Sequence, residues 1–505
     1  MSARILFVGF DSLDKDLLLQ WAEAGVLPTL GALLKSSTHA ATANPPGFYA
    51  DSVWPSFATG LSPARHGYFY PRQTPRGAYV DAEFLPSQQK GETFWETLSK
   101  AGHRVAVLDV PYSPQASHLN GIQLVNWATH DPWSESASSY PPALAGELAA
   151  KFGRQPPDHC DQTTPIVGYK AFVHALGERG KNKLDIFLEC LKRESWDLFA
   201  VAFSEAHCVG HQCWHLHDPS HPRHDPSLAA EIGDPLKEIY RVLDDALARL
   251  LEAAGPEAKV FVFASHGMGP LYRDESIVLD EILHRLDAQP SSSAGFLFRW
   301  LKQCWYSIPS ALRGSPLLQR AKAKLLPALH RSMLVPGRKT RRFFTVPYSP
   351  HCGMIRLNVV GREAHGLVQP GEEYRQVCEY LRKELLALVN TETGRRVVGE
   401  VYLTAELFSG PCLDDLPDVV VEWRRQEPIR AISSPRIGTV KVPDRKWRTG
   451  DHRDRGLLIA RGAPFRAAPL ERPVSVMDLA PTIAMLLGVR LEGVDGKPIR
   501  ELTGF

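Results

Sequence analysis

Short apolar runs alternate with longer amphipathic stretches along most of the chain. The apolar runs lie at residues 5–10, 104–110, 197–203, 259–264, 418–422 and 456–460. Helical spacing lies mostly between them, at residues 14–35, 92–101, 142–152, 181–193 and 234–254. Short continuous apolar runs are typical of strands buried on both faces, and strands that alternate with helices are typical of parallel sheets. The pattern predicts an α/β fold with a mainly parallel central sheet sandwiched by helices.

Several of these predicted strands end at a polar side chain. Asp11 follows the first run, Ser204 and Glu205 follow the third, and Ser265 and His266 follow the fourth. Taken alone, each such residue also fits a helix cap or a loop. Because ligand sites in open α/β sheets gather at the carboxyl ends of the strands, we expect a functional site at this edge.

Residues 286–345 differ in character from the rest of the chain. They are rich in Arg, Lys, Ser, Pro and Leu, and include R-K-T-R-R at 338–342. We interpret this segment as a helical, basic insertion or cap, within a catalytic domain formed by residues 1–285 and 346–505. A basic run of this kind is more often a solvated face than an anion-binding site.

The composition is that of a soluble globular protein. Of the 505 residues, 44% are hydrophobic and 23% charged, and the net charge is +2. This charge gives no strong attraction to nucleic acid or anionic membrane, and we expect no nucleic-acid-binding module. The eight cysteines form no C-x-x-C pair, which favours reduced thiols. With no apolar run near the ~20 residues of a membrane span, we expect a cytoplasmic protein without a membrane segment.

The segment F-S-E-A-H-C-V-G-H-Q-C-W-H-L-H-D, residues 203–218, is unusually rich in histidine. His207 and His211 stand four residues apart, so on a helix both imidazoles lie on one face and can meet one ion. Neutral imidazole is a common ligand of zinc and other first-row metals. Surface histidines are also common, and the spacing alone leaves both interpretations open.

A second segment, A-D-S-V-W-P-S-F-A-T-G-L-S-P-A-R-H-G, contains a candidate nucleophile. Ser52 stands where a helix toward Thr59 would begin. Free backbone N–H groups and the helix dipole at that place suit a hydroxyl that attacks a phosphate. The alternative is that Ser52 only caps the helix. Ser56 is a second candidate, inside the helix.

The order of these segments resembles the alkaline phosphatase superfamily, and most closely its type I phosphodiesterase/nucleotide pyrophosphatase-like branch. The likeness covers nearly the whole chain outside 286–345. It includes I-L-F-V-G-F-D-S-L-D, W-P-S-F-A-T-G-L-S-P-A-R-H-G and F-W-E-T-L-S-K-A-G-H-R-V-A-V-L-D-V-P. It ends with T-G-D-H-R-D-R-G-L-L-I-A-R-G and S-V-M-D-L-A-P-T-I-A-M-L-L-G-V.

The resemblance implies two neighbouring metal ions, commonly zinc. Carried over, one ligand set falls on His207, His211 and His452, and the other on Asp11, Ser265 and His266. His207 and Ser265 stand where such enzymes have Asp. The hydroxyl usually found ten residues before Gly60 is replaced by Ala50, which makes Ser52 the nearest replacement.

Each of these replacements removes a negative charge if the new side chain is neutral, and two nearby cations need anionic ligands to offset their repulsion. Three histidines are nonetheless a good site for one catalytic zinc. The expected cofactor is therefore one or two divalent ions, Zn first and Mn as an alternative.

The resemblance implies a metal-dependent hydrolase of phosphate esters, of the phosphodiesterase or nucleotide pyrophosphatase type. Its substrate would be a small-molecule phosphate ester, attacked by a hydroxyl nucleophile, Ser52, or by metal-bound hydroxide. The alternatives are a catalytically altered or inactive binding protein on the same fold, a phosphotransferase, or a sulfatase relative. The sequence gives no indication of oligomeric state.

Overall fold

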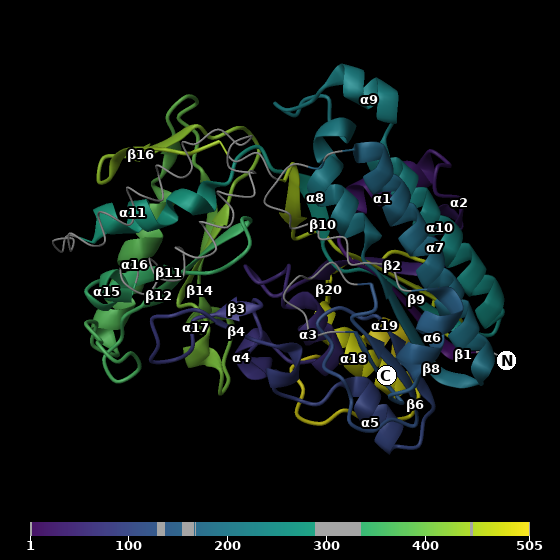
Figure 1. Cartoon of the computed structure of the whole chain (residues 1–505). Helices are drawn as coiled ribbons and strands as arrows, with labels where there is room; N and C mark the ends of the chain where they lie inside the picture. The colour runs from purple at the N-terminus through teal and green to yellow at the C-terminus, as the bar shows by residue number, and fades with distance from the viewer. Residues whose placement is uncertain are drawn as a thin grey trace.

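The computed structural model describes residues 3–128, 137–153, 166, 168–287, 335–444 and 448–503. Figure 1 shows a larger region around a central sheet and a smaller region that contains α11, α16 and β14. The bounds of the two helices in the smaller region are Leu279–Leu286 for α11 and Glu372–Leu386 for α16.

Nine strands of the described chain form the central sheet, in the order β20-β2-β19-β9-β1-β8-β5-β6-β7. The five neighbours from β9 to β6 run parallel, whereas β19 and β7 run antiparallel to the strands beside them. The prediction of an α/β fold with a mainly parallel sheet is confirmed. The strand bounds, in sheet order, are Val474–Ser475, Thr38–Ala43, Leu457–Arg461, Lys259–Ala264, Ala3–Phe10, Trp196–Phe203, Val105–Leu108, Gly121–Val125 and Ser138–Tyr140.

Helices cover both faces of this sheet (Figure 1). Alternate residues of β1 serve the two layers, since Leu6 and Val8 join one buried cluster while Ile5 and Phe7 join the other. The first layer contains α1 Lys15–Glu23, α2 Pro28–Ser36, α6 Leu144–Phe152, α7 Tyr169–Arg193, α8 Glu205–His217 and α10 Pro235–Ala254. The second contains α3 Val53–Thr59, α5 Phe94–Lys100, α18 Leu479–Leu486 and α19 Arg500–Thr503.

None of the described helices is long and apolar enough to cross a membrane alone. Only α1 and α2, joined at a 94° bend, meet the length and composition criteria as a pair.

The smaller region is built on a four-stranded antiparallel sheet, β11-β12-β15-β14. The apolar run at 418–422 forms β15 in this sheet, not a strand of the central one. An apolar run identifies a buried strand but not the sheet that it joins. The strand bounds are Phe343–Val346, Cys352–Leu357, Val419–Trp423 and Val398–Leu403.

Short ribbons and helices complete the described chain. The ribbon that matters for the site pairs β10 Gly267–Pro270 with β18 Gly450–Arg453. The other strands are β3 Arg72–Gln73, β4 Ala82–Glu83, β13 Val389–Asn390, β16 Ala431–Ser434 and β17 Gly438–Lys441. The other helices are α4 Pro63–His66, α9 Pro226–Ile232, α15 Val335–Lys339 and α17 Thr404–Leu407.

The insertion predicted at 286–345 lies mostly outside the described residues, which resume at position 335. Its described end includes most of β11, so that end is part of the smaller sheet. In the basic run, Arg338, Arg341 and Arg342 pair with carboxylates of the protein itself, at N–O distances of 2.7, 2.9 and 3.1 Å. These arginines therefore serve internal ion pairs.

Two buried ion pairs connect α7 to the sheet edge beneath α8. Arg179 Nε lies 2.8 Å from Glu205 Oε1, and Lys183 Nζ lies 2.8 Å from Asp109 Oδ2. All four side chains are almost fully buried. Since Glu205 is the first residue of α8, its pair with Arg179 helps to hold the helix that carries His207 and His211.

Replacing Arg179 with Met should destabilise the fold by about 3–5 kcal/mol, because the buried Glu205 carboxylate loses its hydrogen-bonded partner and keeps only the nearby Lys183 charge. The free energy of unfolding in urea measures this change. The control is Arg4→Met: Arg4 is 61% exposed and pairs with Asp197, so its loss should cost at most about 1 kcal/mol. Equal effects of the two substitutions would contradict the role given to the buried pair.

Candidate metal and catalytic site

Three neighbouring parallel strands deliver the candidate residues to one edge of the sheet. β1 lies between β8 and β9, with Phe10 opposite Phe203 on one side and Ala264 on the other. The backbone continues this alignment past the strand ends, since Asp11 N donates to Phe203 O at 2.8 Å and Ser265 N donates to Phe10 O at 3.1 Å. Asp11, the start of α8, and Ser265 with His266 therefore begin at the same level.

His207, His211 and His452 form a compact buried cluster at this edge. One ring nitrogen of each lies within 4.8 Å of the others, and no other group of three His, Cys, Asp or Glu in the described residues meets this distance. The Nε2 atoms of His207 and His211 are 3.2 Å apart. Two nitrogens bound to one tetrahedral zinc at Zn–N distances of about 2.0–2.1 Å would be about 3.3 Å apart. The cluster therefore fits a single metal ion.

The protonation of the cluster also suits a metal. Burial lowers the pKa of both His211 and His452, so both rings are neutral at pH 7. His211 Nδ1 lies 2.9 Å from the Gly450 carbonyl oxygen, to which only a protonated nitrogen can donate. This bond leaves the lone pair on Nε2, the atom that faces His207. A ligand histidine held through its second nitrogen is the usual arrangement in metal sites.

Glycines allow the helix and the ribbon that carry these histidines to approach closely. A Cβ on Gly210 of α8 would lie 2.7 Å from a Met268 side-chain carbon. A Cβ on Gly450 would lie 2.2 Å from the Gly210 carbonyl oxygen. Both distances are shorter than side-chain contacts allow, so only glycine at these positions lets His452 lie beside His207 and His211.

Asp11, Ser265 and His266 form a hydrogen-bonded chain next to this cluster. Ser265 Oγ donates to Asp11 Oδ1 at 3.1 Å and lies 3.0 Å from His266 Nδ1. At the other side of its ring, His266 Nε2 lies 2.7 Å from Ser12 Oγ and 2.9 Å from His452 Nδ1. The structure thus brings together the six residues predicted as metal ligands and adds Ser12.

The hydrogen bonds from Asp11 through Ser265 to His266 show which ring nitrogen of His266 carries its proton. The single Ser265 proton points to Asp11, so His266 Nδ1 must carry a proton and donate to Ser265 Oγ. Burial lowers the pKa of His266 to about 3, so its ring is neutral and Nε2 is unprotonated. Nε2 is therefore an acceptor, 2.7 Å from the Ser12 hydroxyl.

Asp11 is the only carboxylate in the hydrogen-bonded chain of Asp11, Ser265 and His266, and its oxygen Oδ1 already accepts two hydrogen bonds. Trp54 Nε1 donates to it at 3.0 Å and Ser265 at 3.1 Å. Burial raises the pKa of Asp11 to about 6. Asp11 and His266 are not part of a three-ligand group with any described His, Cys or carboxylate. A second ion on Asp11, Ser265 and His266 stays a prediction.

Ser52 and Ser56, the two hydroxyl groups predicted as nucleophiles, have hydrogen-bond partners outside the histidine cluster. Ser52 precedes α3, but its side chain makes no capping bond and its Oγ donates to the Tyr68 carbonyl at 3.0 Å. Ser56 Oγ lies 3.0 Å from His66 Nε2. Because His66 Nδ1 accepts from Tyr68 N at 3.1 Å, the neutral His66 ring carries its proton on Nε2 and donates to Ser56. His66 thus does not act as a base toward Ser56.

The remaining histidines of the rich segment serve other contacts. His215 Nδ1 lies 3.1 Å from Thr449 Oγ1, and His217 Nδ1 lies 2.9 Å from Asp234 Oδ2. Only the pair spaced four apart near the start of α8 reaches the cluster.

Two residues at the site have no clear signal in the sequence. Ser12 directly follows Asp11 and has a left-handed backbone with φ of 57°, which turns its hydroxyl toward His266. His351 is a single histidine in a loop, and its ring centroid lies 5.6 Å from that of His452. Ser12 can be found from its place beside Asp11, whereas nothing in the local sequence marks His351.

The buried three-histidine cluster lies at the carboxyl edge of a parallel sheet, on an alkaline phosphatase-like fold. The family model for type I phosphodiesterase / nucleotide pyrophosphatase matches residues 5–426. The chain belongs to this family. A search of curated proteins finds no match.

Two of the three solved structures described next show the same fold, at low sequence identity. The wild-type alkaline phosphatase PafA is 13% identical, with a TM-score of 0.54 and coverage of 99% of this chain and 98% of that one. Phosphonoacetate hydrolase from Sinorhizobium meliloti 1021 is 14% identical, with a TM-score of 0.51 and 94% coverage of both chains. Murine ectonucleotide pyrophosphatase / phosphodiesterase 5 is 12% identical, with a TM-score of 0.49 and coverage of 98% of this chain and 97% of that one.

Replacing Gly450 with Ala should weaken metal binding, although residue 450 has no ligand side chain. The new methyl group meets the Gly210 carbonyl oxygen, so β18 must move away from α8 and carry His452 with it. We expect zinc affinity to fall at least as far as the 10–100-fold (roughly) that follows loss of a supporting contact around a metal. Zinc titration against a competing chelator measures the change.

The control is Gly255→Ala, at the end of α10, where an added Cβ meets nothing within 4 Å. Gly255 has a φ of 88°, so this variant reports backbone strain without a steric contact at the site. Equal zinc affinity of the Gly450→Ala variant and the unmodified protein would contradict the role of the close approach.

Proposed function

We propose that this protein is a metal-dependent hydrolase of phosphate esters that holds one divalent cation on His207, His211 and His452. The observation that carries the proposal is the cluster of three buried imidazoles with ligand atoms within 4.8 Å, next to a hydroxyl that has its own base. Membership of the phosphodiesterase family supports the reaction class. Zinc is the first choice of metal, since three histidines with an open position are a known catalytic zinc set.

His207, His211 and His452 would hold a cation, which would supply positive charge to polarise the phosphoryl group and stabilise charge in the transition state. The chain supplies the remaining functions. Ser265 and Asp11 hold the His266 ring with its Nδ1 proton pointing away from the cluster. His266 Nε2 is then set to receive the proton of an attacking hydroxyl.

Ser12 is the hydroxyl that we assign to this attack. Its Oγ lies 2.7 Å from His266 Nε2, within the range that proton transfer requires. The Oγ–P bond forms as the ester P–O bond breaks, the Ser12 proton moves to His266 Nε2, and the same proton then passes to the leaving oxygen, which departs as an alcohol. Water then cleaves the phosphoserine, which releases phosphate or a phosphate monoester and restores the hydroxyl.

Ser52 remains the competing candidate, as the hydroxyl nearest to the family position that Ala50 occupies. In the described chain its hydroxyl has one hydrogen-bond partner, the Tyr68 carbonyl oxygen. A carbonyl oxygen orients the proton but does not remove it. Ser52 would have to give up this bond to the Tyr68 carbonyl before it could attack.

The first test is metal content by mass spectrometry. We expect about one zinc per chain in the wild-type protein, and loss of that zinc in His207→Ala. The reduction in affinity should exceed the roughly 10–100-fold effect of altering a supporting contact. His217→Ala is the matched control, because His217 lies on the same helix but contacts Asp234.

Hydrolysis of bis(p-nitrophenyl) phosphate should follow the metal content across these variants. A stoichiometry of about two would mean that Asp11, Ser265 and His266 hold a second ion. A protein that binds neither zinc nor manganese, and hydrolyses no ester, would be a binding protein on a hydrolase fold, and the proposal would fail.

The second test separates the two hydroxyls. Ser12→Ala should lower kcat by about 10²–10⁴-fold, the usual contribution of a positioned acid–base pair, with zinc retained. Ser52→Ala should retain most of the activity and lose only about 0.5–1.5 kcal/mol of stability with its bond to Tyr68. Acid quenching during turnover, followed by peptide mass spectrometry, should find phosphate on residue 12. The reverse pattern, with activity lost in Ser52→Ala alone, would restore Ser52 as the nucleophile.

A further inference from the structure

A hollow of about 360 Å³ opens beside His452, between the β10–β18 ribbon and the smaller sheet. His452 and its neighbours on β18 form one wall. The opposite wall comes from the smaller sheet, through His351 just before β12 and Arg425 just after β15. Since β12 and β15 pair through Cys352 and Glu422, His351 and Arg425 lie at the same end of that sheet.

His351 lines this hollow and has two buried, unsatisfied ring nitrogens. Its side chain is 1% exposed, and neither ring nitrogen has a hydrogen-bond partner in the described part of the chain. Its contacts are with aromatic rings, at centroid distances of 4.6 Å to Tyr49 and 5.6 Å to His452. A buried polar group without a partner destabilises the fold, and a bound ligand that supplies the partner removes this penalty.

Arg425 lines the same hollow, and the edge of its guanidinium that binds oxyanions is buried without a partner. Its side chain is 8% exposed, and Nη1 lies 2.7 Å from Asp451 Oδ2. Among the described residues, Nε and Nη2 have no hydrogen-bond partner. These two nitrogens form the side-on edge from which a guanidinium donates two parallel hydrogen bonds to a carboxylate or a phosphate.

The charges around the hollow favour an anion. Burial raises the pKa of Glu275, which lies near Arg425, to about 8, so this carboxyl group is neutral at pH 7. The lining holds more cationic than anionic side chains, with Arg424, Arg425, Arg453 and Arg455 against Glu422 and Asp454.

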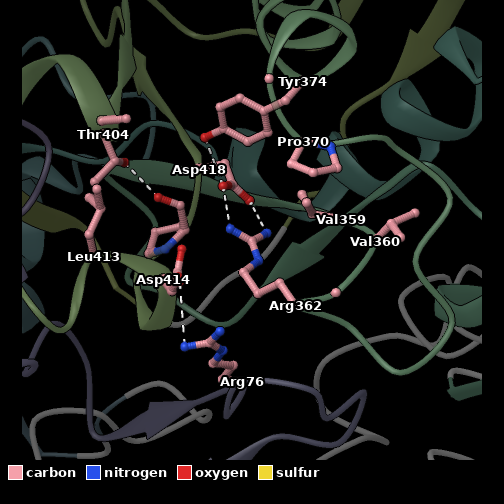
Figure 2. A pocket seen from close by; sticks show the side chains of 14 residues that line it. Arg76, Val359, Val360, Arg362, Pro370, Tyr374, Thr404, Leu413, Asp414 and Asp418 are labelled. Atoms are coloured by element: carbon pink, nitrogen blue, oxygen red, sulfur yellow. Dashed lines mark hydrogen bonds and ion pairs between the residues drawn. The ribbon is translucent and has the colours of Figure 1, made fainter.

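In a second hollow, of about 370 Å³, the buried arginine is already paired with a carboxylate of the protein. Figure 2 shows Arg362 there with two nitrogens directed at the carboxylate of Asp418, at 2.7 Å each. The Tyr374 hydroxyl donates to the same carboxylate at 2.9 Å. Its buried charges are satisfied by the protein, so this hollow does not call for an anion.

We propose that Arg425 and His351 form a subsite for a second acidic group of the substrate, a carboxylate or phosphate separate from the phosphoryl group that reacts at the histidine cluster. The subsite deepens the proposed function and rests on it for the position of the reacting group. The substrates that fit carry two oxyanions close together, because His351 and His452 are in ring contact. The smaller sheet then selects the substrate, and the central sheet carries the reacting groups.

Binding of small phosphonates to the zinc-loaded full-length protein tests the subsite without turnover. Isothermal titration calorimetry compares methylphosphonate, which has one acidic group, with phosphonoacetate and methylenediphosphonate, which have two. The zinc content is measured after each titration, so that chelation is not mistaken for binding. We expect the protein to bind a two-group probe about tenfold or more tightly than methylphosphonate. Preference for phosphonoacetate alone identifies a carboxylate subsite, and preference for methylenediphosphonate alone identifies a phosphate subsite.

Variants assign this preference to its residues. Arg425→Lys keeps the charge beside Asp451 but loses the two-pronged edge, and His351→Phe keeps the ring packed against Tyr49. Both should reduce the preference to within about twofold, since a point charge or an apolar ring cannot replace the lost donors. Arg424→Gln, which removes an exposed positive charge from the same hollow, should retain it.

Equal affinity of the wild-type protein for all three probes would overturn the proposal, as would a preference that survives in both Arg425→Lys and His351→Phe. If no ester is hydrolysed but the preference still depends on Arg425, the proposed function fails and the subsite stands.

Discussion

The parallel pairing of β8, β1 and β9 is the constraint on which the rest of the site depends. Its register places Phe203, Phe10 and Ala264 side by side at the last level of the sheet. The next residues, Ser204, Asp11 and Ser265, therefore lie at the same edge of the sheet, where the backbone amides of Asp11 and Ser265 donate to carbonyl oxygens of the neighbouring strands. A one-residue shift in this register would turn the apolar alternation of the strands inside out. The position of Asp11 relative to His266 is thus fixed by the same contacts that bury the core.

Much of this arrangement could be predicted from the sequence. The apolar runs predicted four of the five parallel strands, all but β6, and a spacing of four on α8 predicted that His207 and His211 would meet. The pairing of His452 with them came from family likeness, because no local spacing links residues that far apart. Local sequence could not reveal the orientation of Ser52, which depends on a carbonyl 16 residues away, or the place of His351, which depends on sheet pairing across the smaller region.

Histidine at 207 and serine at 265 change the charge of the edge in a coherent way. A neutral imidazole at 207 leaves a three-nitrogen set with no carboxylate of its own, which suits one cation better than two. Serine at 265 passes a hydrogen bond from His266 to Asp11 instead of adding a second negative charge. Position 265, where a carboxylate would bind a metal, here carries a hydroxyl that is hydrogen-bonded to the His266 ring. In the proposed function, the two replacements together favour one bound cation at the histidine cluster and His266 as the base that serves Ser12.

The bond between His211 and the Gly450 carbonyl joins positions 239 residues apart, and the contact between His266 and His452 joins positions 186 apart. Closing loops of this size restricts the unfolded chain strongly, with an entropic cost that grows only slowly with length. An ion held by α8 and β18 would act on folding as a removable cross-link between early and late parts of the chain. Chelation would then loosen the late ribbon first, and protease sensitivity near β18 would rise before the central sheet is lost.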